Sequence, residues 1–233
     1  MHKIEIPEYA RRLQRERGMP AQQFEITEPR RTALLVVDMQ NAFVARGGAM
    51  EIPYAREIVP AINRLAHAFR SAGGVVCWIR TSLRDQERSW SVWFSGKLSP
   101  VAGFAAISSL SPGSPSYELF PELAVQDADM FVIKTRFSPF VQGASCLHRE
   151  LIRLGVDTVA ITGTVSNTCC ESTARDAMML NYRTIFVSDA NAARTDEEHN
   201  ATLGNMVQTF ADVVSTEELE RAVVHSSWSP AQG

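Results

Sequence analysis

Three side chains that could support nucleophilic chemistry follow buried-strand patterns, far apart along the chain. Asp38 follows the apolar run TALLVV, Lys134 closes MFVIK, and Cys169 comes soon after TVAIT, at the start of a helical pattern. In open parallel α/β sheets, ligands bind outside the carboxyl ends of the strands. We therefore expect a carboxylate, an ammonium and a thiol at one edge of one sheet.

Together these groups could attack a carbonyl carbon. A thiol at a helix N-terminus is favoured as thiolate by the helix dipole, and a nearby Lys134 ammonium would lower its pKa further. Asp38 could accept the thiol proton and return it to a leaving amine. The loop at 163–168 (GTVSNT) brings backbone N–H groups towards the attacked carbonyl. Such oxyanion donors each contribute roughly 3–4 kcal/mol in known cases.

Each residue also has an ordinary structural interpretation. A single Asp after a strand is commonly a turn residue or a helix cap, and a lone Lys there is commonly a solvated edge residue. A Cys in an apolar helix commonly belongs to the core, which is the role we expect for Cys170. The catalytic hypothesis depends on all three residues falling at carboxyl strand ends.

The rest of the chain supplies elements that could position these residues. Strands are predicted within TALLVVDMQ, VVCWIR, MFVIK, TVAIT and TIFV, with a short last strand from Val213. Helices are predicted around Ile58–Phe69 and at 144–154, 168–180, 197–210 and 216–224. Such alternation implies right-handed β-α-β units. We predict a Rossmann-like three-layer α/β/α fold with a mainly parallel sheet of about six strands.

The predicted domain boundaries enclose one large domain. Residues 1–30 are interpreted as an N-terminal arm with a short helix at Glu8–Arg17, either packed on the body or loosely ordered. Residues 31–226 form the hydrolase-sized domain and 227–233 a tail. The stretch 81–129 contains Trp90, Trp93 and three Phe among Ser, Pro and Gly clusters. A long aromatic connection of this kind either forms a site or covers the body.

Composition excludes several classes of partner. A net charge of −3 over 233 residues gives no electrostatic reason to expect nucleic acid or an anionic membrane. There is no signal-peptide pattern, and no run approaches the roughly 20 apolar residues of a membrane helix. The four cysteines include an adjacent pair that cannot form an ordinary bridge and no C-x-x-C motif. We expect free thiols, a cytoplasmic location, a small-molecule substrate and no cofactor.

The blocks around the three residues resemble a known family. TALLVVDMQNAF, VIKTRFSPF and ITGTVSNTCCESTARDA are similar to three motifs of the isochorismatase-like cysteine hydrolases, and the resemblance runs from about Thr32 to Val224. It implies Asp38 as acid/base, Lys134 as its cationic partner and Cys169 as nucleophile. It also implies a cis peptide at Thr164–Val165, with the Val165 and Cys169 amides as the oxyanion hole.

Positions at which this sequence departs from the family motifs restrict the class of substrate that we expect. Nicotinamidases of the family hold a metal with an Asp and two His after the first block, whereas NAFVARGGAMEIPYARE has no His, so we expect no metal and argue against nicotinamide. RFSPF resembles a segment of both isochorismatases and ureidoacrylate hydrolases, and N-x-C-x-E-S-T resembles the ureidoacrylate group. Overall the motifs are most similar to ureidoacrylate and carbamoyl-type amidohydrolases. Ureidoacrylate hydrolases carry Gln-Asn where Ile79-Arg80-Thr81 follows Trp78, which puts that substrate in doubt.

The resemblance and the strand-edge rule together give a set of candidate substrate-binding residues. They are Asn41, Phe43, Trp78, Arg80, Arg136, Phe137 and Phe140. Either Arg80 or Arg136 could clamp a substrate carboxylate bidentately, although aromatic packing and a solvated arginine are the ordinary alternatives.

These observations favour a hydrolase of C–N bonds in a small non-peptide amide, ureide or N-carbamoyl compound, which acts through a thioester and releases ammonia. One alternative is an isochorismatase-type vinyl ether hydrolase in which Asp38 acts and Cys169 is a bystander; true isochorismatases mostly lack the cysteine. Another is a non-catalytic binding protein of the same fold. The resemblance also implies a homo-oligomer, either a dimer or a tetramer.

Overall fold

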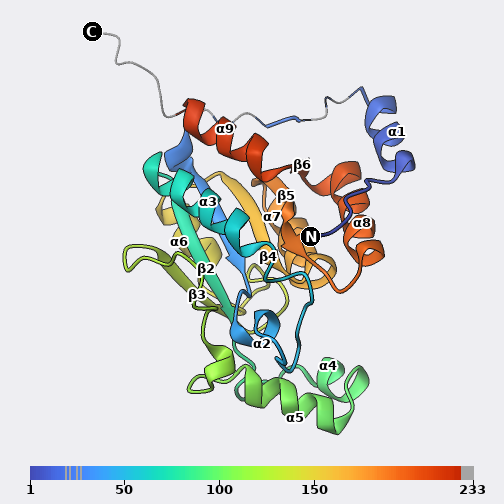
Figure 1. Ribbon diagram of the computed structural model, residues 1–233, viewed down its shortest axis with the longest axis vertical. Helices are drawn as coiled ribbons and strands as arrows, with labels where there is room; N and C mark the ends of the chain where they lie inside the picture. The colour runs from blue at the N-terminus through green and yellow to red at the C-terminus, as the bar shows by residue number, and fades with distance from the viewer. Residues whose placement is uncertain (19, 21, 25, 27, 227–233) are drawn as a thin grey trace.

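A computed structural model describes residues 1–18, 20, 22–24, 26 and 28–226. Its centre is a sheet whose strands all pair in parallel, in the order β3-β2-β1-β4-β5-β6 (Figure 1). The strands are β1 (Thr32–Val37), β2 (Val75–Thr81), β3 (Met130–Lys134), β4 (Thr158–Thr164), β5 (Arg183–Ala192) and β6 (Asp212–Val214).

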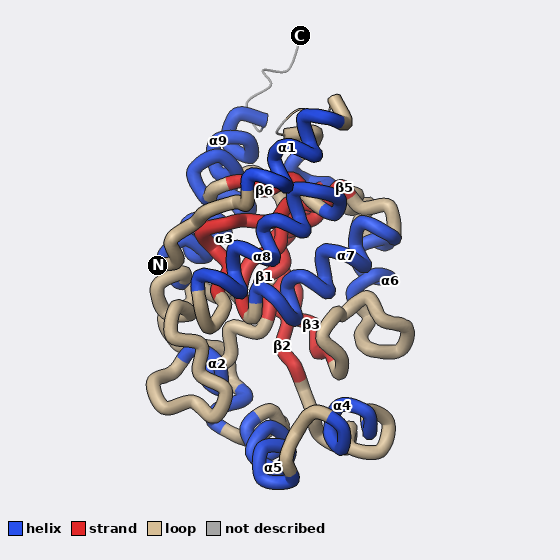
Figure 2. Tube along the Cα trace, turned by 90° about the vertical axis from the view of Figure 1, so that its right-hand side faces the viewer, coloured by secondary structure: helices blue, strands red, loops and turns tan. Residues whose placement is uncertain are grey.

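Helices cover both faces of this sheet. They are α1 (Glu8–Glu16), α2 (Asn41–Val44), α3 (Val59–Ser71), α4 (Ser91–Gly96), α5 (Pro100–Ser109), α6 (Leu147–Arg153), α7 (Glu171–Met179), α8 (Asp196–Asn205) and α9 (Thr216–Ser226). In Figure 2 the strands lie between α3 and α9 on one side and α6 and α7 on the other. The predicted three-layer α/β/α fold is confirmed, with a sheet that is parallel throughout.

Strand β1 is buried on both faces because its side chains alternate between two apolar cores. Leu34 and Val36 join the core beneath α3, whereas Leu35 and Val37 join the core beneath α6 and α7. A strand with apolar residues at every position suits this central place in a parallel sheet. Asp38, the next residue, is the first polar side chain after the run.

Several elements differ at their ends from the sequence prediction. The helix predicted from Ala144 begins at Leu147, whose amide binds the Ser145 hydroxyl. The predicted strand TIFV continues to Ala192, because β5 shifts register against β4 and pairs again at Thr164. Residues Ser166–Cys170 form a π-helical turn, η3, before α7 begins.

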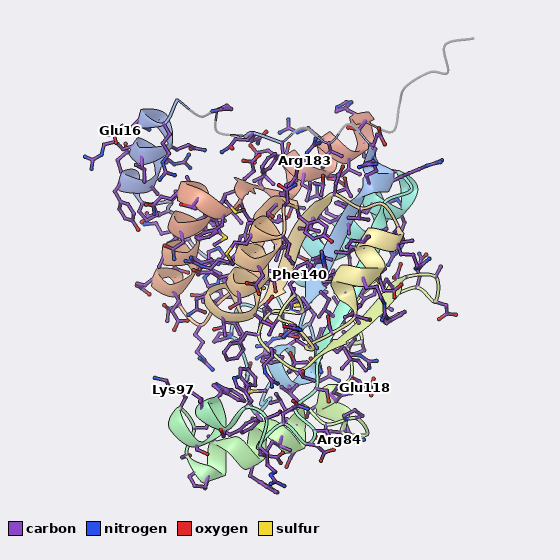
Figure 3. The ribbon with its side chains drawn as sticks, turned by 180° about the vertical axis from the view of Figure 1, so that it is seen from behind. Glu16, Arg84, Lys97, Glu118, Phe140 and Arg183 are labelled. Atoms are coloured by element: carbon purple, nitrogen blue, oxygen red, sulfur yellow. The ribbon has the colours of Figure 1, made fainter. Side chains whose placement is uncertain are left out.

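The long connection between β2 and β3 stands beyond the carboxyl end of the sheet. It contains α4, α5 and the short 3₁₀ helix Pro115–Tyr117, and Figure 3 shows it as a separate lobe marked by Arg84, Lys97 and Glu118. Trp90, Trp93 and Phe94 are packed against one another within it. The aromatic side chains of this stretch therefore gather next to the ends of the strands.

The N-terminal arm contacts the body of the protein. The helix predicted at Glu8–Arg17 is α1, which packs on α8 and on the turn that follows it, and Ala10 is buried there. The predicted tail, 227–233, lies outside the described residues. Over the part of the chain that is described, no helix is long and apolar enough to cross a membrane.

Candidate active site

Four neighbouring strands end around one point. The chain runs outward from β1 to β2 and β3, then returns across the sheet to β4, so the strand order reverses between β1 and β4. A crevice forms at such a switch point, because the connections leave in opposite directions. Asp38 follows β1, Thr81 and Lys134 end β2 and β3, and Cys169 follows β4.

The spacing between β1 and β4 is set by a close backbone contact at Gly163. This residue has φ +114 and pairs with Val37, and a Cβ atom on it would lie 2.1 Å from the Val37 carbonyl oxygen. The contact brings Thr164 beside Asp38, where the Thr164 hydroxyl donates to the Asp38 carbonyl oxygen at 2.9 Å. A side chain at position 163 would separate the two strands at the point where the site forms.

The polar groups are linked in one buried network. Lys134 Nζ lies 2.8 Å from Asp38 Oδ2 and 3.5 Å from Cys169 Sγ. The same ammonium donates to the Thr81 hydroxyl at 2.6 Å and to the Arg136 carbonyl at 3.1 Å. Thr81 in turn donates to Asp38 Oδ1 at 2.8 Å. The thiol, the ammonium and the carboxylate predicted from the strand ends are therefore brought together.

Burial controls the protonation of this network. Asp38 and Lys134 have no solvent exposure. Burial alone would lower the pKa of Lys134, but the contact with Asp38, together with Cys169, outweighs burial and raises that pKa. Burial also raises the pKa of Cys169 to about 12, opposed by Lys134 and reinforced by Asp38. The resting site is thus an Asp38–Lys134 ion pair beside a protonated thiol, rather than the thiolate that the helix terminus suggested.

The turn between β4 and α7 presents the thiol. The Thr164–Val165 peptide bond is cis, as the resemblance implied. Cys169 lies in the π-helical turn that follows, and the amides of Thr168 and Cys170 both bind the Val165 carbonyl. Cys170 points away into the core, where burial raises its pKa well above the usual range.

A cavity of about 430 Å³ opens onto Cys169. Its wall consists largely of apolar side chains from the β2–β3 connection, from α2 and from the residues after α2. The lining residues are Phe43, Ala49, Met50, Ile52, Thr81, Leu83, Trp90, Trp93, Leu98, Ala102, Ala105, Ala106, Leu110, Arg136, Phe137, Val165, Thr168, Cys169 and Arg194. The stretch 81–129 therefore contributes to the wall of this cavity rather than only covering the body of the protein.

Two arginines are the charged residues among those that line the cavity. Arg136 binds neutral oxygens of Gln86, Thr135 and Ser89, at 2.7–3.4 Å, and its guanidinium lies 5.0 Å from the centre of the Trp90 ring. Arg194 follows β5 in the loop before α8 and is exposed. No acidic side chain lines this cavity among the described residues, so the other lining residues are apolar or neutral polar ones.

The seven candidate substrate-binding residues divide into two groups. Phe43, Arg136 and Phe137 line the cavity. The side chains of the other four are held elsewhere, and they are Asn41, Trp78, Arg80 and Phe140. Asn41 binds the Pro115 carbonyl, and Trp78 is fully buried with its indole N–H on Asp129.

Arg80 and Phe140 have equally definite partners away from the cavity. Arg80 pairs with Glu118 at 3.0 Å and lies over the Tyr117 ring. Phe140 packs against His148 and Tyr182. In β2 the side chains alternate, so Trp78 and Arg80 face one side while Thr81 faces the other with Lys134. This alternation leaves Thr81 and not Arg80 at the site.

Thr81 and Arg194 were not identified from the sequence. Thr81 immediately follows the predicted strand VVCWIR, as Asp38 follows TALLVV, so the rule that selected Asp38 also applied to it. Arg194 was missed because the strand TIFV was expected to end at Val187, whereas β5 ends at Ala192. No group of three or more His, Cys, Asp or Glu side chains that could hold a metal occurs in the described part of the chain.

Comparison with known proteins finds a matching domain family and relatives in both sequence and structure. The isochorismatase domain matches residues 32–218. Ureidoacrylate amidohydrolase RutB of Caulobacter vibrioides is 32% identical over 205 residues, covering 81% of this chain and 89% of that protein. A cysteine hydrolase from Pseudomonas syringae superposes with a TM-score of 0.80 at 30% identity, over 90% of this chain and 99% of the other.

A second solved structure that is similar to this chain has a named amidase activity. The N-carbamoylsarcosine amidase of Thermoplasma acidophilum gives a TM-score of 0.63 at 27% identity, over 80% of this chain and 97% of that one. The domain match covers most of the sequence and includes every residue of the buried network. The chain belongs to the isochorismatase family of hydrolases.

Proposed function

We propose that this protein is a cysteine-dependent amidohydrolase that cleaves a C–N bond in a small non-peptide amide, ureide or N-carbamoyl compound. The observation that carries the proposal is the contact of Cys169 with Lys134, which forms a buried ion pair with Asp38, in the wall of a largely apolar cavity. The RutB and N-carbamoylsarcosine amidase relatives, which are amidohydrolases by name, support the same class of reaction.

The raised pKa of Cys169 defines the first proton transfer. Because the thiol carries its proton at neutral pH, sulfur can attack the carbonyl carbon only as a base removes that proton. Asp38, whose carboxylate contacts the same Lys134 ammonium as the thiol, is the proposed acceptor. Lys134 and Thr81 hold the carboxylate in place. The amides of Val165 and Cys169 are proposed to bind the oxyanion that forms.

The remaining steps return the site to its resting state. Asp38 gives the proton to the leaving nitrogen, the C–N bond breaks, and an amine or ammonia leaves a thioester on Cys169. Water then attacks the thioester while Asp38 accepts a proton from it. The C–S bond breaks, the acid departs, and the sulfur recovers its proton from Asp38.

The residues that line the cavity favour a substrate that carries an anionic group. Trp90, Trp93 and Phe137 offer flat apolar surfaces, while Arg136 and Arg194 have no carboxylate of this chain paired with them among the described residues. Arginine binds carboxylates through two parallel hydrogen bonds. We include both arginines in the proposed substrate site, with the cleaved carbonyl at Cys169 and the substrate carboxylate at the arginines.

The test is release of ammonia from a panel of small amides, ureides and N-carbamoyl amino acids. Cys169→Ala should abolish release, whereas the matched variant Cys170→Ala, at the neighbouring core position, should retain it. Full activity in Cys169→Ala would contradict the thioester mechanism. Turnover of a vinyl ether by that variant would support the isochorismatase-type alternative instead.

The proposal extends to the assembly and location of the protein. We propose a homo-oligomer, dimer or tetramer, in the cytoplasm, with a small molecule as its partner. Sedimentation of the purified protein as a strict monomer would contradict the oligomer.

A further inference from the structure

The first residues of the chain are bound next to the cavity. The side chain of His2 is 2% exposed, and both of its ring nitrogens have partners. Nδ1 lies 2.7 Å from Asp196 Oδ1, and Nε2 lies 3.0 Å from the Ala193 amide nitrogen. Asn200 binds the backbone just after His2, at the Lys3 carbonyl and the Glu5 amide.

The partners of His2 fix its protonation. A backbone amide can only donate, so Nε2 must accept from Ala193 and the single ring proton must lie on Nδ1, which donates to Asp196. This arrangement requires a neutral ring. A protonated His2 would direct an N–H at the N–H of Ala193 and lose that hydrogen bond.

A second histidine continues the contact towards the reactive turn. The rings of His2 and His199 are stacked with centroids 4.3 Å apart. His199 Nε2 lies 2.9 Å from the Ser188 carbonyl and must donate to it, so Nδ1 accepts from the Ser166 hydroxyl at 2.8 Å. Ser166 begins the π-helical turn that carries Cys169.

His2 therefore contacts one segment that contributes to the cavity directly and a second segment through His199. Ala193, which it binds directly, precedes Arg194, and His199 connects it to Ser166, which follows Val165. We propose that His2 is a positioning residue, which fixes the loop at Ala193 so that Arg194 meets the carboxylate of the substrate. This inference rests on the proposed function, in which Arg194 is part of the substrate site.

Acidification should weaken this contact. The groups that face His2 are the Asp196 carboxylate, the amino terminus (itself paired with Glu57), and the rings of Tyr54 and His199. Burial lowers the pKa of His2, and Asp196 opposes that effect. As pH falls below the usual histidine range, protonation removes the acceptor for Ala193, and selectivity for an anionic ligand should fall with it.

The experiment compares alkylation of Cys169 by iodoacetate, which carries a carboxylate, and by neutral iodoacetamide. In both reactions sulfur displaces iodide and the thiol proton is lost, so the ratio of the two rates isolates recognition of the carboxylate. Peptide mass spectrometry separates Cys169 from the partly exposed Cys146. No knowledge of the natural substrate is needed.

Two isosteric variants separate the two hydrogen bonds of His2. His2→Asn can retain the bond to Asp196 but not the acceptor for Ala193, whereas His2→Gln can place an amide oxygen where Nε2 lies. We expect Arg194→Ala to lower the iodoacetate-to-iodoacetamide ratio about tenfold, the loss of one charge-assisted contact, and His2→Asn to lower it by about as much because Arg194 is then no longer positioned. His2→Gln should keep the ratio within about twofold of the parent, and the exposed-histidine control His67→Ala should leave it unchanged.

The outcomes distinguish this inference from the proposed function. An unchanged ratio in His2→Asn, with a lowered ratio in Arg194→Ala, would show that His2 does not position the arginine. An unchanged ratio in both would overturn the carboxylate site and the inference together. An equal loss in His2→Gln and His2→Asn would also overturn it, because the Ala193 acceptor would then not matter. The amidase proposal is judged separately, by ammonia release in Cys169→Ala.

Discussion

Replacement of Lys134 by Met should strongly destabilise the protein, because it leaves a buried charge without its partner. Lys134 and Asp38 are both fully buried at 2.8 Å, and Met has nearly the shape of Lys without the ammonium. Removing one member of such a pair costs about 3–5 kcal/mol. For a chain of this size that corresponds to a fall in Tm of roughly 6–20 °C.

A double-mutant cycle identifies the origin of the loss. Asp38→Asn/Lys134→Met contains neither charge, and the Asn oxygen can still accept from Thr81 in place of Oδ1. We expect the double variant to recover at least about half of the stability that Lys134→Met loses. The free energy of unfolding would be measured by urea denaturation at pH 7 for the parent, both single variants and the double variant. Additive losses, or a loss of under about 1 kcal/mol in Lys134→Met, would refute a tightly coupled buried pair.

Three further predictions follow from other contacts. His199→Gln should flatten the acid side of the stability curve, since burial lowers the pKa of His199 to about 4. Between about pH 6.5 and 4 the unfolded chain binds a proton at this histidine that the folded chain does not. The free energy of unfolding therefore falls by about 3 kcal/mol as pH drops through that range. Urea denaturation at several pH values should show that this contribution is missing in the variant. Asp38→Asn should lower the pKa of Cys169 below about 12, because the carboxylate raises it and Lys134 remains to lower it. Thiolate absorbance at 240 nm should rise at lower pH than in the parent, and this early rise should be missing in Asp38→Asn/Cys169→Ala, in which the other three thiols give the background. Trp78→Phe should reduce stability by about 1–3 kcal/mol through the lost bond to Asp129 while leaving KM unchanged, and a raised KM would return Trp78 to the substrate site.

The sequence was sufficient for the fold and for the polar residues that follow or end β1, β3 and β4. TALLVVD, MFVIK and TVAIT are short, strongly apolar runs, so their ends were placed within a residue or two and the parallel arrangement brought their polar neighbours together. Side chains on β2 were harder to assign. Both faces of a central strand are apolar, and nothing in VVCWIRT indicates which face meets the cavity, so Arg80 was chosen where Thr81 stands.

The protonation of Cys169 and the last residues of β5 could not be predicted from the sequence alone. The dipole of a helix N-terminus favours a thiolate, but this effect is small compared with complete burial beside a carboxylate, and burial cannot be read from a local motif. Arg194 depends on a register shift between β4 and β5, which is a property of two strands together. His2 lies almost two hundred residues from its partners along the chain and has no local pattern.

The cavity wall and the reacting groups belong to different parts of the chain. The connection between Thr81 and Met130 supplies more of the cavity wall than any other segment, whereas the reacting network is held at the strand ends and in the turn after β4. Insertions, deletions or exchanges within this one stretch can reshape the space for a substrate while the sheet keeps the chemistry in register. A fold in which one connection shapes the cavity can accept new substrates through changes in that connection alone. The β2–β3 connection is therefore the segment to change when substrate specificity is redesigned.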